Sequence, residues 1–559
     1  MGEAKELTIA GLFLAGHEES ASSPTSTSAP AAGFSRKPFD PHNFYSMKAK
    51  ALLTIILLLV ALSTALTHAA EATKSSSTNA PVEAKKDAPA RETNAPVVTE
   101  ASVVIDGKSI HYKATAGALP ILGKDGKSTA QVFYISYTQT NLVDAAERPI
   151  TYCFNGGPGS SSVWLHLGAF GPKRVDFPGD GTTAPRPPGR LIPNEHSLLD
   201  VTDLVFIDPV STGYSRAEQP DKASDFYGQN NDIATVAEFI RLYTTREKRW
   251  RSPKFLAGES YGVFRAAGLA NYLQSRFNLY LNGLVLVSGV IDFETIRAEG
   301  LTDTPYLCFL SAITASAHYH KKLPADLQAD FKKAIAESRA FAEGDYARAL
   351  RLGAALPPAE RTAAVAKLAR LTGLPTSYIE DHDLRVSAFE FRKQLLKSEG
   401  KIIGRFDARV VSRDGNAASA TPEFDPSHVI VSGVFSSAMN SYVREDLKFE
   451  KDNPYEILTG VQPWPWARNS GYPSTGPDLA AAMKENPHLK IFIQCAWRDL
   501  ACPPDGILHS VRQLSLPAEI RSNIRVEEYE AGHMLYLNPP DLKKSAADMK
   551  DFIRKTVAN

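Results

Sequence analysis

A serine between two glycines, in Gly258-Glu259-Ser260-Tyr261-Gly262, is the part of this sequence best suited to chemistry. An apolar segment, residues 253–257, precedes it, and residues 263–273 follow with apolar side chains at helical spacing. Ser260 is therefore predicted at a sharp turn between a buried strand and a helix, with the helix N-terminus facing any developing negative charge. This is the form of a nucleophile elbow, although a glycine-flanked serine is also a common helix cap.

A serine nucleophile needs a base, and the base needs an orienting carboxylate. Asp499 follows the apolar run 491–495, and His533 follows the run 526–529. Both are then expected at the C-terminal edge of a parallel sheet, in the chain order Ser, Asp, His that α/β-hydrolases use. We predict a triad of Ser260, Asp499 and His533. The rival histidines lie in less suitable positions: His166, His196 and His509.

The oxyanion of such a reaction needs two backbone N–H donors. One is predicted from Tyr261, directly after the nucleophile, and the other from Gly157 in the glycine-rich loop 155–162. That loop follows the predicted strand 150–154. It lacks the Lys-Ser/Thr pair of a phosphate-binding loop, which argues against nucleotide binding.

The remaining elements predict an α/β-hydrolase fold: a mostly parallel central sheet with helices on both faces. Hairpin signals begin near Ala101, continuous apolar runs follow, and residues 315–397 have helical periodicity without a convincing strand. We expect that helical block to be an insertion that covers the site as a lid, or a separate packing unit. The predicted division is an upstream extension (1–46), a signal peptide (47–70), a disordered linker (71–100), core (101–294), a mainly helical insertion (295–430) and core again (431–559).

The predicted signal peptide has a basic start at Met47-Lys48-Ala49-Lys50, an apolar run over residues 51–66 and small residues after it. The run is shorter than the ~20 residues that usually span a bilayer, but an uncleaved anchor is the alternative. We take Met47 as the biological start. The body is expected to be exported, periplasmic or secreted, with no stable membrane span after cleavage.

Charge and cysteine content exclude several functions. The chain has 62 basic and 62 acidic residues, for a net charge of +0, so no nucleic-acid partner is indicated. Its four cysteines favour free, buried thiols over a disulfide framework, with a local bridge between Cys495 and Cys502 as the alternative. No metal ligand cluster or cofactor motif is found. A homodimer is as compatible with these patterns as a monomer.

Four motifs in the same order resemble the serine carboxypeptidase family of carboxypeptidase Y and cathepsin A: residues 155–159, 206–215, 258–262 and 532–534. The forms 160–162 and 499–501 are most similar to its bacterial exported members. The resemblance implies that Asn155, Gly156 and Glu259 bind the substrate's C-terminal carboxylate. A protonated Glu259 would donate to that carboxylate, so peptide hydrolysis is expected to be favoured at acidic pH.

The chain departs from the family pattern at three positions. Cys153 replaces a tryptophan, Ser160 replaces a cysteine, and Ala169 stands where a glutamate is usual, while Cys502 lies where some relatives keep a free thiol. The expected activity is release of C-terminal amino acids from peptides through an acyl-enzyme. The alternatives are an esterase or acyltransferase on the same scaffold and, less favoured because every triad element is present, a silent binding protein.

Overall fold

The computed structural model describes residues 95–142, 144–299, 301–467 and 471–558. The predicted upstream extension, the signal peptide and most of the predicted linker lie outside these residues. Within the described ranges, no helix combines the length and the apolar character needed to cross a membrane.

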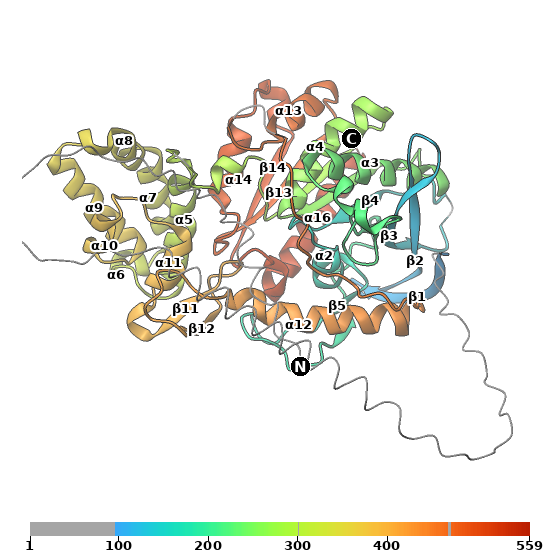
Figure 1. Ribbon diagram of the computed structural model, residues 1–559, viewed down its shortest axis with the longest axis horizontal. Coiled ribbons are helices and arrows are strands. Elements are labelled where there is room, and N and C mark those ends of the chain that lie inside the picture. The colour runs from blue at the N-terminus through green and yellow to red at the C-terminus, as the bar shows by residue number, and fades with distance from the viewer. Residues whose placement is uncertain (1–94, 143, 300, 468–470, 559) are drawn as a thin grey trace, which may run out of the picture. The chain divides into compact units, whose positions relative to one another are not determined.

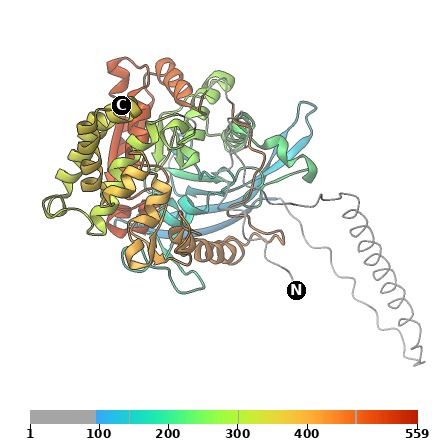
Figure 2. The same cartoon turned by 60° about the vertical axis from the view of Figure 1, so that its left-hand side comes forward.

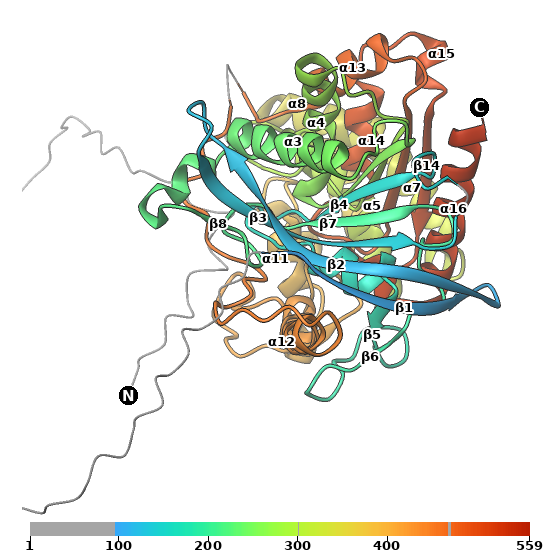
Figure 3. The same ribbon diagram turned by 90° about the vertical axis from the view of Figure 1, so that its right-hand side faces the viewer.

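Ten of the described strands form one sheet in the order β1-β2-β3-β7-β4-β9-β10-β13-β14, with β8 paired to β3. Strands β7 to β14 of this order run parallel, whereas β1, β2 and β3 form an antiparallel edge that extends beyond the parallel strands (Figure 3). The predicted α/β fold with a mostly parallel sheet is confirmed. The bounds are β1 (Val97–Ile105), β2 (Lys108–Leu122), β3 (Ser128–Gln139), β4 (Ile150–Phe154), β7 (Asp203–Ile207), β8 (Arg216–Ala217), β9 (Lys254–Glu259), β10 (Gly283–Val287), β13 (Lys490–Ala496) and β14 (Ile524–Tyr529).

The first hairpin forms where the sequence predicts it, with Asp106 and Gly107 both at positive φ in the turn. Its first strand begins earlier than expected, because β1 pairs with β2 from Val97 onward. The predicted linker, residues 71–100, therefore overlaps the sheet at its end. The polar composition of this edge strand, most of which is exposed, hides it from a pattern search.

Helices cover both faces of the sheet, as predicted, because side chains along the inner strands alternate between two apolar layers (Figure 2). In β9, Phe255 and Ala257 enter one layer and Leu256 enters the other. The Leu256 layer contains α3 (Gln229–Arg246), α4 (Tyr261–Phe277), α13 (Gly476–Glu485) and α14 (Pro504–Arg512). The opposite layer contains α2 (Val163–Leu165), α12 (Pro426–Ser441) and α16 (Pro539–Ala558).

Between β10 and α12, helices α5 to α11 gather into a bundle around an apolar cluster of their own (Figure 1). This cluster also takes in Leu500 and Ala408, so the bundle packs against the loop that follows β13. The bounds are α5 (Thr304–Tyr319), α6 (Ala325–Gln328), α7 (Phe331–Glu343), α8 (Asp345–Leu352), α9 (Pro358–Thr372), α10 (Thr376–Asp381), α11 (Ala388–Gln394), and a small hairpin of β11 (Lys401–Ile403) and β12 (Val411–Arg413).

The expected boundary at residue 430 is wrong, because it falls inside α12. Val431, Val434 and Phe435 of that helix pack into the same apolar layer as α2 and α16. Helix α12 therefore belongs to the core. The other described elements are short: β5 (Lys173–Val175), β6 (Leu191–Pro193), α15 (Ala518–Arg521), the π-helices η1 (His166–Phe170) and η6 (Tyr442–Asp446), and the 3-10 turns η2 (Pro220–Phe226), η3 (Phe293–Thr295), η4 (Gly353–Ala355), η5 (Lys397–Glu399) and η7 (Leu535–Leu537).

Candidate active site

Ser260 occupies the turn between β9 and α4 in a backbone conformation rare for any residue but glycine, with φ 62° and ψ −128°. Such strain is typical of a nucleophile elbow. The turn is tight enough that a Cβ on Gly258 would lie 2.2 Å from the carbonyl oxygen of Gly262. Both neighbours of Ser260 are buried while Ser260 itself is partly exposed, so the turn presents its hydroxyl.

Asp499 and His533 lie together, as their positions after β13 and β14 predict. His533 Nδ1 is 2.7 Å from Asp499 Oδ2, and both side chains are buried. The other carboxylate oxygen accepts hydrogen bonds from the N–H groups of Ala501 and Cys502, at 2.7 and 2.8 Å. Burial alone would lower the pKa of His533, but the charge and hydrogen bond of Asp499 outweigh it and the pKa is raised. This arrangement leaves Nε2 of the imidazole to act as a base.

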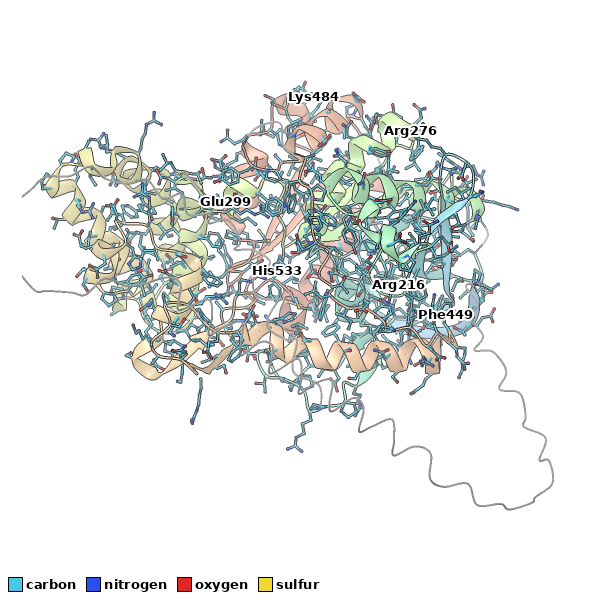
Figure 4. The ribbon with its side chains drawn as sticks, viewed as in Figure 1. Arg216, Arg276, Glu299, Phe449, Lys484 and His533 are labelled. Carbon is cyan, nitrogen blue, oxygen red and sulfur yellow. The ribbon has the colours of Figure 1, made fainter. Side chains whose placement is uncertain are left out.

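A loop from the inserted region, residues 404–410, holds both of these segments, and we call it the clamp loop. Its Phe406 carbonyl accepts the N–H of His533 at 2.5 Å, and its Arg405 carbonyl accepts the N–H of Leu500 at 3.0 Å. In return, the N–H of Ala408 donates to the carbonyl of Arg498. The Phe406 ring also stacks on the imidazole of His533, with centroids 5.1 Å apart and planes at 14°. Figure 4 labels His533, which lies between the inserted helices and the sheet in that view.

The Ser260 hydroxyl is near the thiol of Cys502, which forms a hydrogen bond with it. Burial raises the pKa of Cys502 well above its usual value, so the thiol stays neutral. Within the described residues no hydrogen bond joins Ser260 to His533, a contact that often tightens only when substrate binds. All four cysteines, which the described residues include, are free and buried, as predicted.

The glycine-rich loop lies against the elbow. A Cβ on Gly156 would be 2.4 Å from the backbone nitrogen of Tyr261, so only glycine fits there. Tyr261 begins α4, and its N–H therefore has no acceptor within the helix. The loop is tied down farther along by Asp208, whose carboxylate accepts the N–H of Ser162 at 2.8 Å and the hydroxyl of Tyr455 at 2.8 Å. The segment that carries Gly157 therefore lies against the start of α4, where the Tyr261 N–H is found.

Asn155 and Tyr261 are both held by one buried ion pair. Arg265 binds Asp232 at 2.7 Å and donates to the carbonyl of Asn155 at 2.6 Å. Asp232 also accepts the hydroxyl of Tyr261 at 3.1 Å. The side-chain oxygen of Asn155 accepts the N–H of Leu165, which turns its amide nitrogen towards Glu259. The asparagine is thus fixed from both ends.

Glu259 is buried directly before the nucleophile. Burial raises the pKa of its carboxyl to about 7, while the charge of His533 and hydrogen bonds from Tyr536 and Asn155 act in the opposite direction. The Tyr536 hydroxyl lies 3.0 and 3.3 Å from the two carboxyl oxygens. A carboxyl with this pKa carries a proton at mildly acidic pH and loses it above neutrality.

The rival histidines serve elsewhere. His166 is buried against Phe206 with its Nε2 2.6 Å from the Tyr137 hydroxyl, His196 is paired with Glu195, and His509 is part of α14.

Two aromatic residues at the site were not identified from the sequence. Tyr536, three residues after His533, was detectable as a polar group in an apolar segment, whereas nothing local marks Phe406.

Comparison with known proteins identifies the family. The pattern of the family described as serine carboxypeptidase matches residues 108–521, more than half of the chain. The chain belongs to the serine carboxypeptidase family. The matched span contains Asn155, Glu259, Ser260 and Asp499 and ends before His533.

Individual members of the serine carboxypeptidase family are similar over shorter segments. The pheromone-processing carboxypeptidase KEX1 of Debaryomyces hansenii is 32% identical over 189 residues, which are 31% of this chain and 24% of that protein. Serine carboxypeptidase-like 36 of Arabidopsis thaliana is 28% identical over 163 residues, 28% of this chain and 31% of that protein. The chain thus spans about a quarter to a third of the length of these relatives.

The fold is shared with a solved member of the family. The crystal structure of Kex1(delta)p from Saccharomyces cerevisiae, a prohormone-processing carboxypeptidase, has a TM-score of 0.50 with 18% sequence identity. The likeness covers 79% of this chain and 91% of that chain. The architecture is therefore retained where most of the sequence has changed.

Proposed function

We propose that this protein is a serine carboxypeptidase that releases C-terminal amino acids from peptides. The observation that carries the proposal is the buried carboxyl of Glu259, which lies beside the nucleophile and is hydrogen-bonded by Asn155. A protonated carboxyl and an amide are both donors, and together they suit a substrate carboxylate. An enzyme that attacks esters or internal peptide bonds has no need of such a pair.

The proposed reaction uses the triad and the two backbone donors. Ser260 Oγ attacks the carbonyl carbon of the last peptide bond while His533 Nε2 takes its proton. Asp499 stabilises the imidazolium, and the N–H groups of Gly157 and Tyr261 stabilise the oxyanion. His533 then returns the proton to the leaving amino group as the C–N bond breaks. Water attacks the resulting ester through the same base and frees the shortened peptide and Ser260.

Two groups with opposite requirements set the pH dependence. His533 must be neutral to accept a proton, and its raised pKa limits the rate on the acidic side. Glu259 must be protonated to bind the carboxylate, and its pKa of about 7 limits the rate on the alkaline side. Release from free acids is therefore bell-shaped in pH, whereas ester hydrolysis has the acidic limb, set by His533, but no alkaline limb. Because Glu259 and His533 interact, the two apparent values belong to the pair.

The test uses a blocked dipeptide as its free acid, its C-terminal amide and its ethyl ester, from pH 4.5 to 8.5, with wild type and Ser260→Ala. We expect terminal-residue release from the free acid to fall above about pH 7 while ester hydrolysis does not, and both to drop at least about 1,000-fold in Ser260→Ala. Ester hydrolysis without release from the free acid at any pH would instead assign an esterase or acyltransferase.

We further propose that the protein acts outside the cytoplasm, in the periplasm or as a secreted enzyme. The basic, apolar and small-residue pattern of residues 47–70 supports this. The N-terminal sequence of the exported protein checks it, with cleavage expected shortly after residue 69. A product that retains residues 51–66 would contradict cleavage and favour an anchor.

A further inference from the structure

Tyr536 is the buried group at this site to which the triad mechanism gives no part. It lies on η7, three residues after His533, and it is 3% exposed. Its hydroxyl is within hydrogen-bond distance of both oxygens of Glu259, at 3.0 and 3.3 Å. The loop that carries the base therefore also contacts the residue before the nucleophile.

The tyrosine ring packs closely against η1. A Cβ on Gly168, in η1, would lie 2.3 Å from Cε2 of the ring, so only glycine leaves room at this position. The next residue is Ala169, also small and buried. With its ring packed against η1 and its hydroxyl on Glu259, Tyr536 has little freedom to turn away.

Four groups act most strongly on Glu259, and they come from three segments. Asn155 at the end of β4 and Tyr536 on η7 are neutral hydrogen-bond donors, and His533 and Asp499 act through their charges. The neighbouring Cys502 thiol is kept neutral by burial, and the cation of Arg405 faces the same space, where it acts on His533 and Cys502. The two neutral donors are the groups that can orient the Glu259 carboxyl without demanding that it ionise.

We propose that Tyr536 is a positioning residue that orients the Glu259 carboxyl towards the terminal carboxylate of the substrate, an inference that rests on the proposed function. A protonated carboxyl has one acceptor oxygen and one hydroxyl. Tyr536 donates to the acceptor oxygen and so leaves the hydroxyl to donate to the substrate. An anionic carboxylate is a stronger acceptor than a phenol oxygen, so the Glu259 proton goes to the substrate rather than to Tyr536.

The same bond sets an upper pH limit for carboxylate recognition. The Tyr536 hydroxyl also stabilises ionised Glu259, and its hydrogen bond opposes the effect of burial on the pKa of that carboxyl. Removal of the Tyr536 hydroxyl has two consequences, which kinetic measurements can tell apart. The carboxyl is less well oriented, which weakens binding of free acids, and it keeps its proton to higher pH, which moves the alkaline limb upward.

The experiment compares wild type with Tyr536→Phe, Glu259→Gln and the double variant, on the blocked dipeptide free acid and its ethyl ester. For Tyr536→Phe we expect KM for the free acid to rise roughly tenfold and the alkaline limb to move up by roughly one pH unit, with ester hydrolysis changed less than about threefold. Glu259→Gln should abolish the alkaline limb. In the double variant, where residue 259 no longer titrates, the Tyr536 change should still raise KM for the free acid but should move no limb of the pH profile.

The matched control is Tyr529→Phe, which removes a buried tyrosine hydroxyl that donates to Asp548 at 2.8 Å, away from the site. Tyr529→Phe should lower the melting temperature about as much as Tyr536→Phe does, but it should leave the pH profiles of both substrates unchanged. If Tyr536→Phe lowered activity equally on the free acid and the ester and did not move the alkaline limb, the inference would be overturned. Tyr536 would then have only a packing role. Failure of the wild type on the free acid, with ester hydrolysis intact, would instead overturn the proposed function.

Discussion

Ser260 and His533 are directed at the same reaction, but different kinds of structure hold them there. Ser260 follows β9, an inner strand with β4 and β10 on either side, and close backbone contacts surround its turn. His533 follows β14, the last strand of the sheet, which has one neighbour and is only half-buried along most of its length. The clamp loop supplies what that edge lacks, a backbone acceptor for His533 and a ring against its imidazole.

The difference shows how two halves of one site are encoded. The nucleophile side is specified over short stretches, because a strand, a glycine-flanked turn and a helix follow each other directly. The base side depends on a segment about a hundred residues away in sequence, since Phe406 and Arg405 come from the inserted region. We expect substitutions on the nucleophile side to act through close backbone packing, and those on the base side to act through orientation of the imidazole.

The largest effect is expected where the backbone packing is closest. In Gly156→Ala the new Cβ would lie 2.4 Å from the Tyr261 nitrogen, so the elbow or the glycine-rich loop must move and the oxyanion donors separate. We expect kcat/KM to fall at least roughly 1,000-fold, about 4 kcal/mol of transition-state stabilisation, for acid and ester alike.

Gly433→Ala in α12 is the control for this substitution, because nothing lies within 4 Å of its added Cβ. It should retain activity and gain up to about 1 kcal/mol of stability, as expected for alanine within a helix. Activity within tenfold of wild type in Gly156→Ala would show that the nucleophile side tolerates movement, and the proposed contrast between the two sides would be lost.

The second effect concerns Glu259, which belongs to the nucleophile side but contacts the base side. Its pKa rises from an ordinary 4.5 to about 7 on folding, so the folded state binds the proton more tightly and stability falls as pH rises from about 4.5 to about 7. Glu259→Gln removes this fall. Relative to wild type, the variant should gain about 3 kcal/mol in the free energy of unfolding between pH 4 and pH 8.

Urea denaturation at those two pH values measures the difference, and only the change between them counts, because the amide alters packing equally at both. A gain that is the same at pH 4 and at pH 8 would mean that Glu259 does not hold its proton in the folded protein. The alkaline limit proposed for carboxylate recognition would then have another source.

The smallest effect is expected from Phe406→Ala, which removes the ring stacked on His533 but keeps the backbone bonds of the clamp loop. A less well-oriented imidazole should lower kcat roughly 30-fold, about 2 kcal/mol, equally for acid and ester and without a shift of the alkaline limb. Phe406→Leu should lose less. Phe424→Ala, a more exposed phenylalanine in the segment before α12, should leave kcat unchanged. A loss confined to free acids would place Phe406 in substrate recognition instead.

The nucleophile side could be predicted from the sequence more fully than the base side. The inner strands and the elbow were predictable because each is a continuous apolar run or a short motif, and Asp499 and His533 were placed by the strands before them. The start of β1 and the extent of α12 were misjudged, since burial of an edge strand or of one helix face depends on distant partners. The clamp loop contacts join segments far apart in sequence, and no local pattern records them.

The departure at Ala169 illustrates the limit at a single position. From the sequence alone, a small residue at this position indicates only that the glutamate usual in the family is missing. In the folded chain, Gly168 next to it leaves the space that the Tyr536 ring fills, and the tyrosine hydroxyl donates to Glu259. Tyr536 lies more than three hundred residues away in sequence, so this contact is visible only once the two segments pack together.

The clamp loop also ties folding of the inserted region to catalysis. Because its backbone bonds reach the segments of both Asp499 and His533, any opening that detaches the loop releases the two segments in one cooperative step. Ser260 would keep its backbone position while the loop is detached, since its N–H donates to the carbonyl of Val287 in β10. The protein would then pass through states in which the nucleophile side is folded but catalysis does not occur. The opening equilibrium of the helical bundle would set the fraction of molecules that can catalyse the reaction.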